Sequence, residues 1–127
     1  MKRFKRIAAG LLATATMAIG IGGLSASAST ASDNYSVFTW SKSGSSVSVS
    51  IKNTTKTTRM AQVNSTGYDA YGNYIGFISN EGNIGDSQTL SKSGTLSGAV
   101  SVTFSGNLYS SRTAVGTPLS HWSRSIG

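Results

Sequence analysis

His121 is the single histidine of the chain, so any general acid–base or triad mechanism would depend on it. It lies between Pro118 and the C-terminus, a region where chains are often poorly ordered. No Gly-x-Ser-x-Gly motif presents a serine nucleophile on a sharp turn. We therefore expect an exposed terminal histidine and no catalytic residues, and keep hydrolysis through His121 as a minor alternative.

The four carboxylates do not form a convincing glycosidase pair, which needs two acids about 5 to 10 Å apart across a cleft. Asp33 belongs to a predicted flexible lead-in and Asp69 to a predicted turn, which leaves Glu81 and Asp86 in one glycine-containing loop over 81–86. Calcium takes oxygen ligands of this kind but needs six to eight of them, and the spacing is not that of an EF-hand. We interpret the segment as a solvated loop and predict neither a metal site nor a cofactor.

Aromatic side chains are numerous for a domain otherwise built of serine, glycine and threonine, and exposed aromatic groups mark contact surfaces. Tyr68, Tyr71 and Tyr74 surround one predicted turn and are the expected exposed set. Phe38 and Trp40 lie on the face of a predicted strand opposite Val37, so they are either core or a second exposed pair. Both placements stay open, and we include the pair among the candidate binding residues. Flat rings beside hydroxyl groups suit a sugar or a protein partner.

The segment 69–73 predicts a β-turn that holds the tyrosines together. Asp69 can accept a hydrogen bond from the following backbone, and Gly72 can adopt a positive φ. The turn should bring residues 67–68 against 74–79. We interpret Asp69 as a turn former rather than a catalytic acid.

The N-terminal residues predict export. Four basic residues within 2–6 precede an uncharged run over 7–24 and a small-residue cleavage motif that ends at Ala28. Glycines interrupt the run, which is short of the about 20 strongly apolar residues of a membrane span. We predict a signal peptide over 1–28, cleaved after Ala28, and a secreted, extracellular protein. The absence of cysteine excludes a disulfide scaffold and, with this leader, favours a bacterial exported protein.

Removal of the leader lowers the formal net charge from +7 to +3, because four of the eleven basic residues lie within it and all four acidic residues follow it. The remaining basic residues are spread singly along the chain. This spacing argues against a nucleic-acid partner. It still allows a mild attraction to anionic surfaces such as membranes or acidic wall polymers.

The residues after a flexible lead-in at 29–34 alternate between apolar and polar types with the period of β-strands. We expect strands at 35–41, 46–52, within 57–66, at 74–79, 87–92, 99–105 and 107–115. The fold class is therefore all-β, with a single small antiparallel β-sandwich over 35–127. An immunoglobulin-like topology is compatible with this pattern, and a small barrel is the alternative.

Function follows from these features only in outline. Exposed tyrosines and the lack of a catalytic set favour a secreted, non-catalytic β domain that binds an extracellular partner, such as a wall polysaccharide or a surface protein. The alternative is a small cationic antimicrobial protein or toxin. The mature chain lacks the amphipathic cationic helix that usually carries such an activity. The oligomeric state is not indicated.

Overall fold

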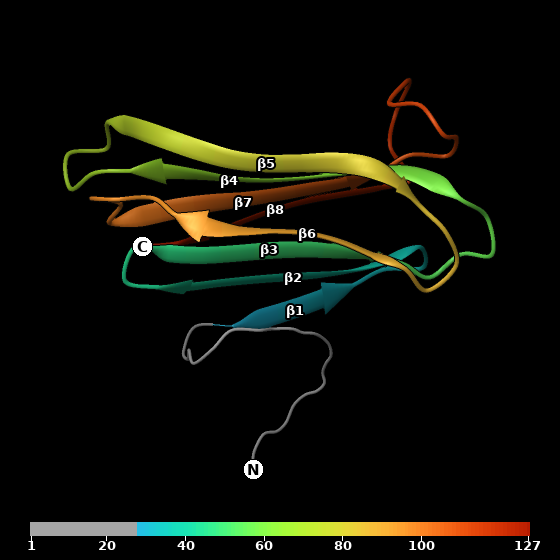
Figure 1. The fold of residues 1–127 in the computed structure, drawn as a ribbon, viewed down its shortest axis with the longest axis horizontal. Helices are drawn as coiled ribbons and strands as arrows, with labels where there is room; N and C mark the ends of the chain where they lie inside the picture. The colour runs from blue at the N-terminus through green and yellow to red at the C-terminus, as the bar shows by residue number, and fades with distance from the viewer. Residues whose placement is uncertain (1–27) are drawn as a thin grey trace, which may run out of the picture.

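Eight antiparallel strands form two four-stranded sheets that pack face to face (Figure 1). The structure is a computed structural model that describes residues 28–127, so the predicted leader lies outside the described residues except for Ala28. One sheet has the order β1-β2-β3-β6 and the other β5-β4-β7-β8. The strands are β1 (Ser29–Ser32), β2 (Ser36–Ser43), β3 (Ser46–Asn53), β4 (Arg59–Tyr68), β5 (Tyr74–Ile84), β6 (Thr89–Thr95), β7 (Ser101–Leu108) and β8 (Ser120–Ile126).

The predicted β-sandwich is confirmed. β3 pairs with β6 and β4 pairs with β7, as strands B with E and C with F pair in immunoglobulin-like sandwiches. The two sheets do not merge into a barrel. Within the described part of the chain, no helix is long and apolar enough to cross a membrane.

The core lies between the sheets because apolar side chains alternate with polar ones along each central strand. Each fully buried Val, Ile, Leu or Phe stabilises the fold by roughly 1.5–3 kcal/mol. The buried hydrophobic residues are Phe38, Trp40, Val47, Val49, Ile51, Ala61, Val63, Ile84, Leu96, Ala99, Val102, Phe104, Leu108 and Trp122.

Phe38 and Trp40 belong to this core, so their prediction as surface binding residues is wrong. Phe38 is fully buried and Trp40 is 9% exposed. The Phe38 ring stacks on Trp40 at 5.6 Å and on Trp122 at 5.9 Å between centroids. Burying the three stacked rings removes more apolar surface from water than burying Val37 would. Val37 therefore lies on the outer side of β2.

Residues 29–34 form ordered structure rather than the predicted flexible lead-in. β1 pairs with β2, and Ala31 packs against the core. Asp33 Oδ1 accepts hydrogen bonds from the backbone N–H groups of Tyr35 and Ser36 and from the Ser120 hydroxyl. This carboxylate ties the β1–β2 turn to β8, a long-range contact that local composition does not reveal.

Two further boundaries differ from expectation. β5 continues through Glu81 to Ile84, because pairing with β4 holds the glycine-containing segment that was predicted as a loop. The last strand is β8, which starts after Pro118, whereas residues 109–119 form the connection in place of the strand predicted at 107–115. His121 therefore lies on an ordered strand, although its side chain is exposed as predicted.

Candidate binding surfaces

The outward face of the β5-β4-β7-β8 sheet concentrates amide side chains and aromatic rings, and we call it the amide face. Its residues occupy paired positions across the four strands, so they form transverse rows. The face comprises Met60, Gln62, Asn64, Thr66, Tyr68, Tyr74, Phe77, Ser79, Glu81, Asn83, Ser101, Thr103, Ser105, Asn107, His121, Ser123 and Ser125.

One row forms a continuous hydrogen-bonded ladder across all four strands. Gln62 Nε2 donates to Glu81 Oε1 at 3.1 Å, and Asn107 Nδ2 donates to Gln62 Oε1 at 3.2 Å. His121 Nδ1 lies 2.6 Å from Asn107 Oδ1. The Tyr109 hydroxyl adds a second donor to Gln62 Oε1 at 3.1 Å.

The carboxylate at one end sets the direction of the whole ladder. An ionised Glu81 only accepts hydrogen bonds, so Gln62 must turn its NH₂ group toward it and its oxygen toward Asn107. Asn107 then presents its own oxygen to His121, whose Nδ1 must carry the hydrogen. With Nδ1 directed at Asn107, Nε2 is the ring nitrogen left for another partner. Each amide nitrogen also keeps a second N–H for another partner.

A shallow depression of about 540 Å³ lies beside this ladder on the same sheet. It is lined by residues 62–64 of β4, 79–81 of β5 and 105–107 of β7. Polar groups dominate the lining, and the hollow is open to solvent. Its shape suits a ligand that lies on the sheet rather than one enclosed by it.

The β4–β5 hairpin carries Tyr68, Tyr71 and Tyr74, and we call it the tyrosine hairpin. It lies at one end of the amide face, and its predicted turn is confirmed. Asp69 Oδ1 accepts from the backbone N–H groups of Tyr71 and Asn73, both at 2.9 Å, and Gly72 has φ +80°. The hydrogen bond from the Asn73 backbone lowers the pKa of the Asp69 carboxyl below its usual value. The structure thus accounts for Asp69 as a turn former.

Exposed apolar side chains gather around this hairpin. Tyr71 is 89% exposed, Tyr74 59% and Phe77 55%, and Tyr68 is half-buried beside Tyr74. Ile75 and Val100 are also exposed, so five of the seven exposed large hydrophobic side chains of the described residues lie at or near this turn. The hairpin therefore supplies rings to the end of the amide face.

The outward face of the other sheet is chemically different, and we call it the hydroxyl face. It consists almost entirely of short hydroxyl side chains, with no amide or aromatic side chain at its outward positions. Its residues are Thr30, Ser32, Val37, Thr39, Ser41, Ser43, Ser46, Ser48, Ser50, Lys52, Thr89, Ser91, Ser93 and Thr95.

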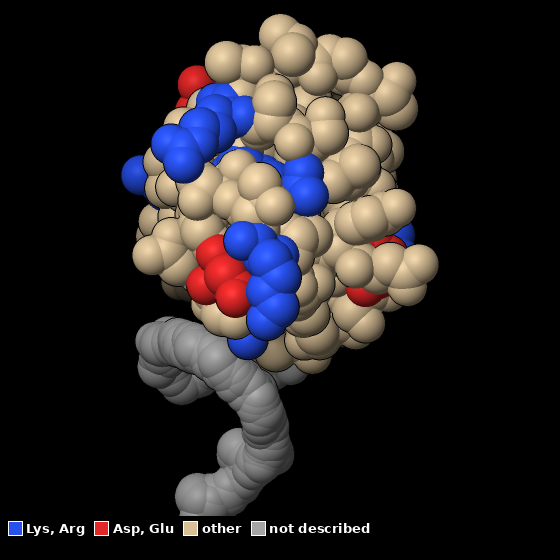
Figure 2. All heavy atoms as spheres, turned by 90° about the vertical axis from the view of Figure 1, so that its right-hand side faces the viewer, with Lys and Arg blue, Asp and Glu red and all other residues tan. Residues whose placement is uncertain are grey.

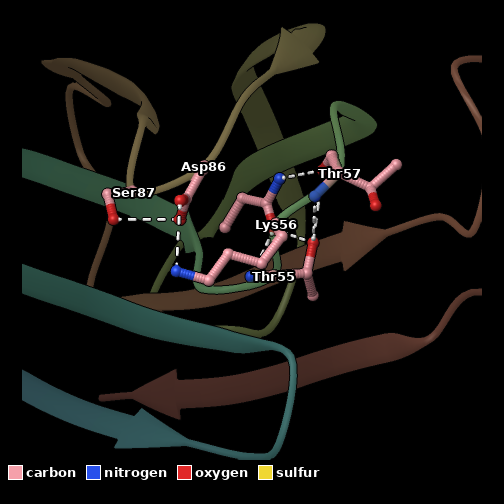
Figure 3. Close-up of polar contacts among 6 residues, drawn as sticks. Thr55, Lys56, Thr57, Asp86 and Ser87 are labelled. Atoms are coloured by element: carbon pink, nitrogen blue, oxygen red, sulfur yellow. Dashed lines mark hydrogen bonds and ion pairs between the residues drawn. The ribbon is translucent and has the colours of Figure 1, made fainter.

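The acidic residues of the predicted 81–86 loop are separated in the structure. Glu81 belongs to the ladder, whereas Asp86 lies in the β5–β6 connection, 3.7 Å from Lys56 Nζ and hydrogen-bonded to Ser87 (Figure 3). The described residues contain no group of three His, Cys, Asp or Glu side chains that could hold a metal ion.

The end of the sandwich that carries Lys56 shows both signs of charge. Basic side chains are separated by uncharged ones there, and acidic groups lie next to some of them (Figure 2).

Beneath the β3–β4 connection, which contains Lys56, the buried Asn53 side chain donates to the carbonyl oxygens of Thr57 and Ile84 and accepts from Thr55. These hydrogen bonds account for the conformation of the β3–β4 connection, which is therefore a structural feature.

Sequence reasoning missed the ladder and Tyr109 as members of a candidate site. Gln62 and Asn64 alternate with Ala61 and Val63, a signal that places both amides on one outward face. The sequence contains no corresponding signal for the partner side chains. Asn107 and His121 join the row only through the pairing of β7 with β4 and β8.

Comparisons with known proteins show no family for this chain. No protein-family model matches the chain, and no curated protein matches it. A solved structure of a putative β-galactosidase from Bacteroides fragilis is similar over 80% of this chain, with 14% identity and a TM-score of 0.44. The match covers 15% of that chain. We draw no functional argument from this likeness.

Proposed function

We propose that the protein is a secreted, non-catalytic domain that binds an uncharged extracellular glycan on the amide face. The observation that carries this proposal is the directed ladder from His121 through Asn107 and Gln62 to Glu81. Because its members hold one another, their free N–H groups and lone pairs keep fixed positions before a ligand arrives. Such preorganisation lowers the entropy cost of binding.

The chemistry of the face matches that of a sugar. Sugar hydroxyls both donate and accept hydrogen bonds, and amide side chains do the same. The rings of Tyr74 and Phe77 offer flat apolar surfaces for the C–H faces of pyranose rings. Glu81 is the only acidic side chain on the face, and Lys and Arg are absent from it. An uncharged ligand therefore fits better than a polyanion.

The contacts of the carboxylates support binding rather than hydrolysis. Glu81 accepts a hydrogen bond from the Gln62 amide, and Asp69 accepts one from the Asn73 backbone within its turn. Asp86 forms an ion pair with Lys56. Asp33 accepts from the β1–β2 turn and from Ser120. Each of the four acids thus has a structural partner.

Retention on insoluble chitin and cellulose tests the proposal, using the protein purified from the medium of an exporting host. We expect Gln62→Ala and Asn107→Ala to weaken retention about tenfold each, since a lost hydrogen bond and an unpaired neighbour together cost roughly 1–3 kcal/mol. Ser50→Ala on the hydroxyl face is the matched control and should bind as wild type does. Wild-type retention by both ladder variants, or an equal loss in the control, would contradict the proposal.

Secretion has its own test. N-terminal sequencing of the exported protein should start at Ser29, immediately after Ala28. Recovery of the intact leader on protein from the medium would refute the predicted cleavage.

A further inference from the structure

We infer that the ligand is an extended, uncharged β-(1→4)-linked oligosaccharide that lies along β4, between the Tyr68–Tyr74 pair and Tyr109. This inference rests on the proposed function and adds the direction and the linkage of the bound chain. It follows from where the rings, the amides and the charges lie on the face.

Aromatic rings mark the two ends of β4 on its outward side. Tyr68 is paired with Tyr74 at one end. At the other end, the Tyr109 backbone N–H donates to the Met60 carbonyl oxygen, while its hydroxyl reaches back to Gln62. The Tyr109 ring therefore lies over the sheet between the row of Met60 and the row of Gln62. Met60 and Tyr68 are eight residues apart, which is about 27 Å along an antiparallel strand.

The floor between the rings is continuous and polar. Thr66, Asn64 and Gln62 follow one another on the outward side of β4, and Thr66 Oγ1 donates to Asn64 Oδ1 at 2.7 Å. The shallow depression lies over Gln62 and Asn64, midway along this path. A sugar chain along β4 would therefore meet a ring, a series of amide and hydroxyl groups, and a second ring.

The same layout disfavours a chain that crosses the strands. Across the sheet, the outward side of β8 offers only His121, Ser123 and Ser125, and no tyrosine, phenylalanine or tryptophan ring. A ligand placed along the ladder would pass Tyr109 but would not reach the Tyr68–Tyr74 pair at the other end of β4. Stacking of a nucleic-acid base on an aromatic side chain is worth about 1–3 kcal/mol, and comparable contacts at both ends of β4 favour a ligand that runs along the strand.

The placement of rings at both ends of a flat strand favours one linkage. A β-(1→4)-linked chain is a straight, flat ribbon that can reach both rings along a sheet. An α-(1→4)-linked chain curves, so it would leave the sheet after contact with one ring. A β-(1→4)-linked uronic acid chain has the right shape but would bring its carboxylates close to Glu81, where like charges repel.

Titration calorimetry with soluble oligosaccharides tests the inference. The probes are β-(1→4)-linked glucose and N-acetylglucosamine oligomers of two to six units, maltohexaose and a hexamer of β-(1→4)-linked mannuronic acid. We expect at least tenfold tighter binding of a β-(1→4) hexamer than of its dimer, and at least tenfold weaker binding of maltohexaose and of the acidic hexamer.

Ring variants separate the ends of the path. Tyr74→Ala and Tyr109→Ala should each remove most of the gain with length, whereas Tyr109→Phe, which keeps the ring and loses the ladder hydrogen bond, should retain it. Tyr35→Ala, an exposed tyrosine in the β1–β2 turn, is the control and should leave the gain intact.

The outcomes distinguish the inference from the proposed function. Binding that is equal for dimer and hexamer but still lost in Gln62→Ala would overturn the extended path and leave glycan binding standing. Equal binding of maltohexaose and the β-linked hexamer would overturn the linkage. Failure of every probe together with failure of the retention assay on chitin and cellulose would overturn both.

Discussion

The two outward faces of the sandwich differ in side-chain length, and this difference decides how each face is organised. On the hydroxyl face, two cross-strand side-chain hydrogen bonds occur, Thr30–Thr39 at 3.3 Å and Ser93–Ser48 at 3.0 Å. On the amide face, one row is linked through all four strands. Paired residues in a sheet have Cβ atoms about 4.5–5.5 Å apart, a gap that amide side chains span readily and hydroxyls seldom do.

The inner faces differ as well. The sheet that carries the hydroxyl face, here the hydroxyl sheet, contributes the large rings of Phe38 and Trp40 to the core. The sheet that carries the amide face, here the amide sheet, leaves space for the Phe38 ring at Gly106. A Cβ atom added at Gly106 would lie 2.6 Å from Phe38 Cε1. The sheet that offers the longer side chains to solvent thus carries a glycine where the core is tightest.

The largest expected effect comes from filling that space. Gly106→Val should destabilise the domain by about 3 kcal/mol or more, because the added side chain must displace the fully buried Phe38 ring. Chemical denaturation followed by tryptophan fluorescence measures the loss. Gly82→Ala is the control, since a Cβ there meets Leu90 at an ordinary 3.8 Å. Equal stability of Gly106→Val and wild type would show that the core at Phe38 is looser than the structure indicates.

A second pair of changes contrasts a paired buried hydroxyl with an unpaired one. Ser36 on the hydroxyl sheet accepts from Trp122 Nε1 at 2.9 Å, whereas Ser65 on the amide sheet has no hydrogen-bond partner. Ser36→Ala should lower the free energy of unfolding by about 1–3 kcal/mol, because it orphans a buried indole N–H. Ser65→Ala should raise it by up to about 1 kcal/mol. A lower stability of Ser65→Ala would mean that its hydroxyl has a partner in solution.

The contrast between the outward faces predicts a difference in energetic coupling. A double-mutant cycle of Gln62→Ala and Asn107→Ala should give a coupling of about 0.5–1 kcal/mol in the free energy of unfolding, since the two amides are bonded directly. The matched cycle uses Ser50→Ala and Ser91→Ala, which are paired across β3 and β6 on the hydroxyl face. Its coupling should be near zero. Similar values in the two cycles would remove the distinction between the faces.

The smallest effect concerns the tyrosine hairpin and depends on pH. Asn73 and Tyr71 backbone N–H groups favour the charged form of Asp69 and lower its pKa. Its stabilising contribution is therefore present above the unfolded pKa of about 3.9 and is lost as pH falls through the lower folded pKa. Asp69→Asn should melt slightly below wild type at pH 7, because an amide oxygen accepts the same bonds but carries no charge, and should lose less stability on acidification. An equal loss of stability on acidification in the variant and in wild type would show that the charge of Asp69 does not contribute.

Local pattern was sufficient for the central strands and for the turn. The alternation in 46–52 and 99–105 predicts β3 and β7 because a half-buried strand must change face at every residue. Asp69 and Gly72 predict the hairpin because their conformational preferences are properties of single residues. The sandwich itself follows from the number and spacing of such strands.

Contacts between segments far apart in the chain decided the rest. Whether Phe38 or Val37 faces inward depends on the space at Gly106, and β1 and β8 become strands through their pairing with β2 and β7. The candidate site depends on the same contacts, because Glu81, Gln62, Asn107 and His121 form one row only when β5, β4, β7 and β8 lie in register. The sequence by itself determined which segments form strands and which of their residues share a face. Tertiary packing determined which strands pair, and so which side chains contact one another, because pairing depends on the apolar surface that the whole domain buries.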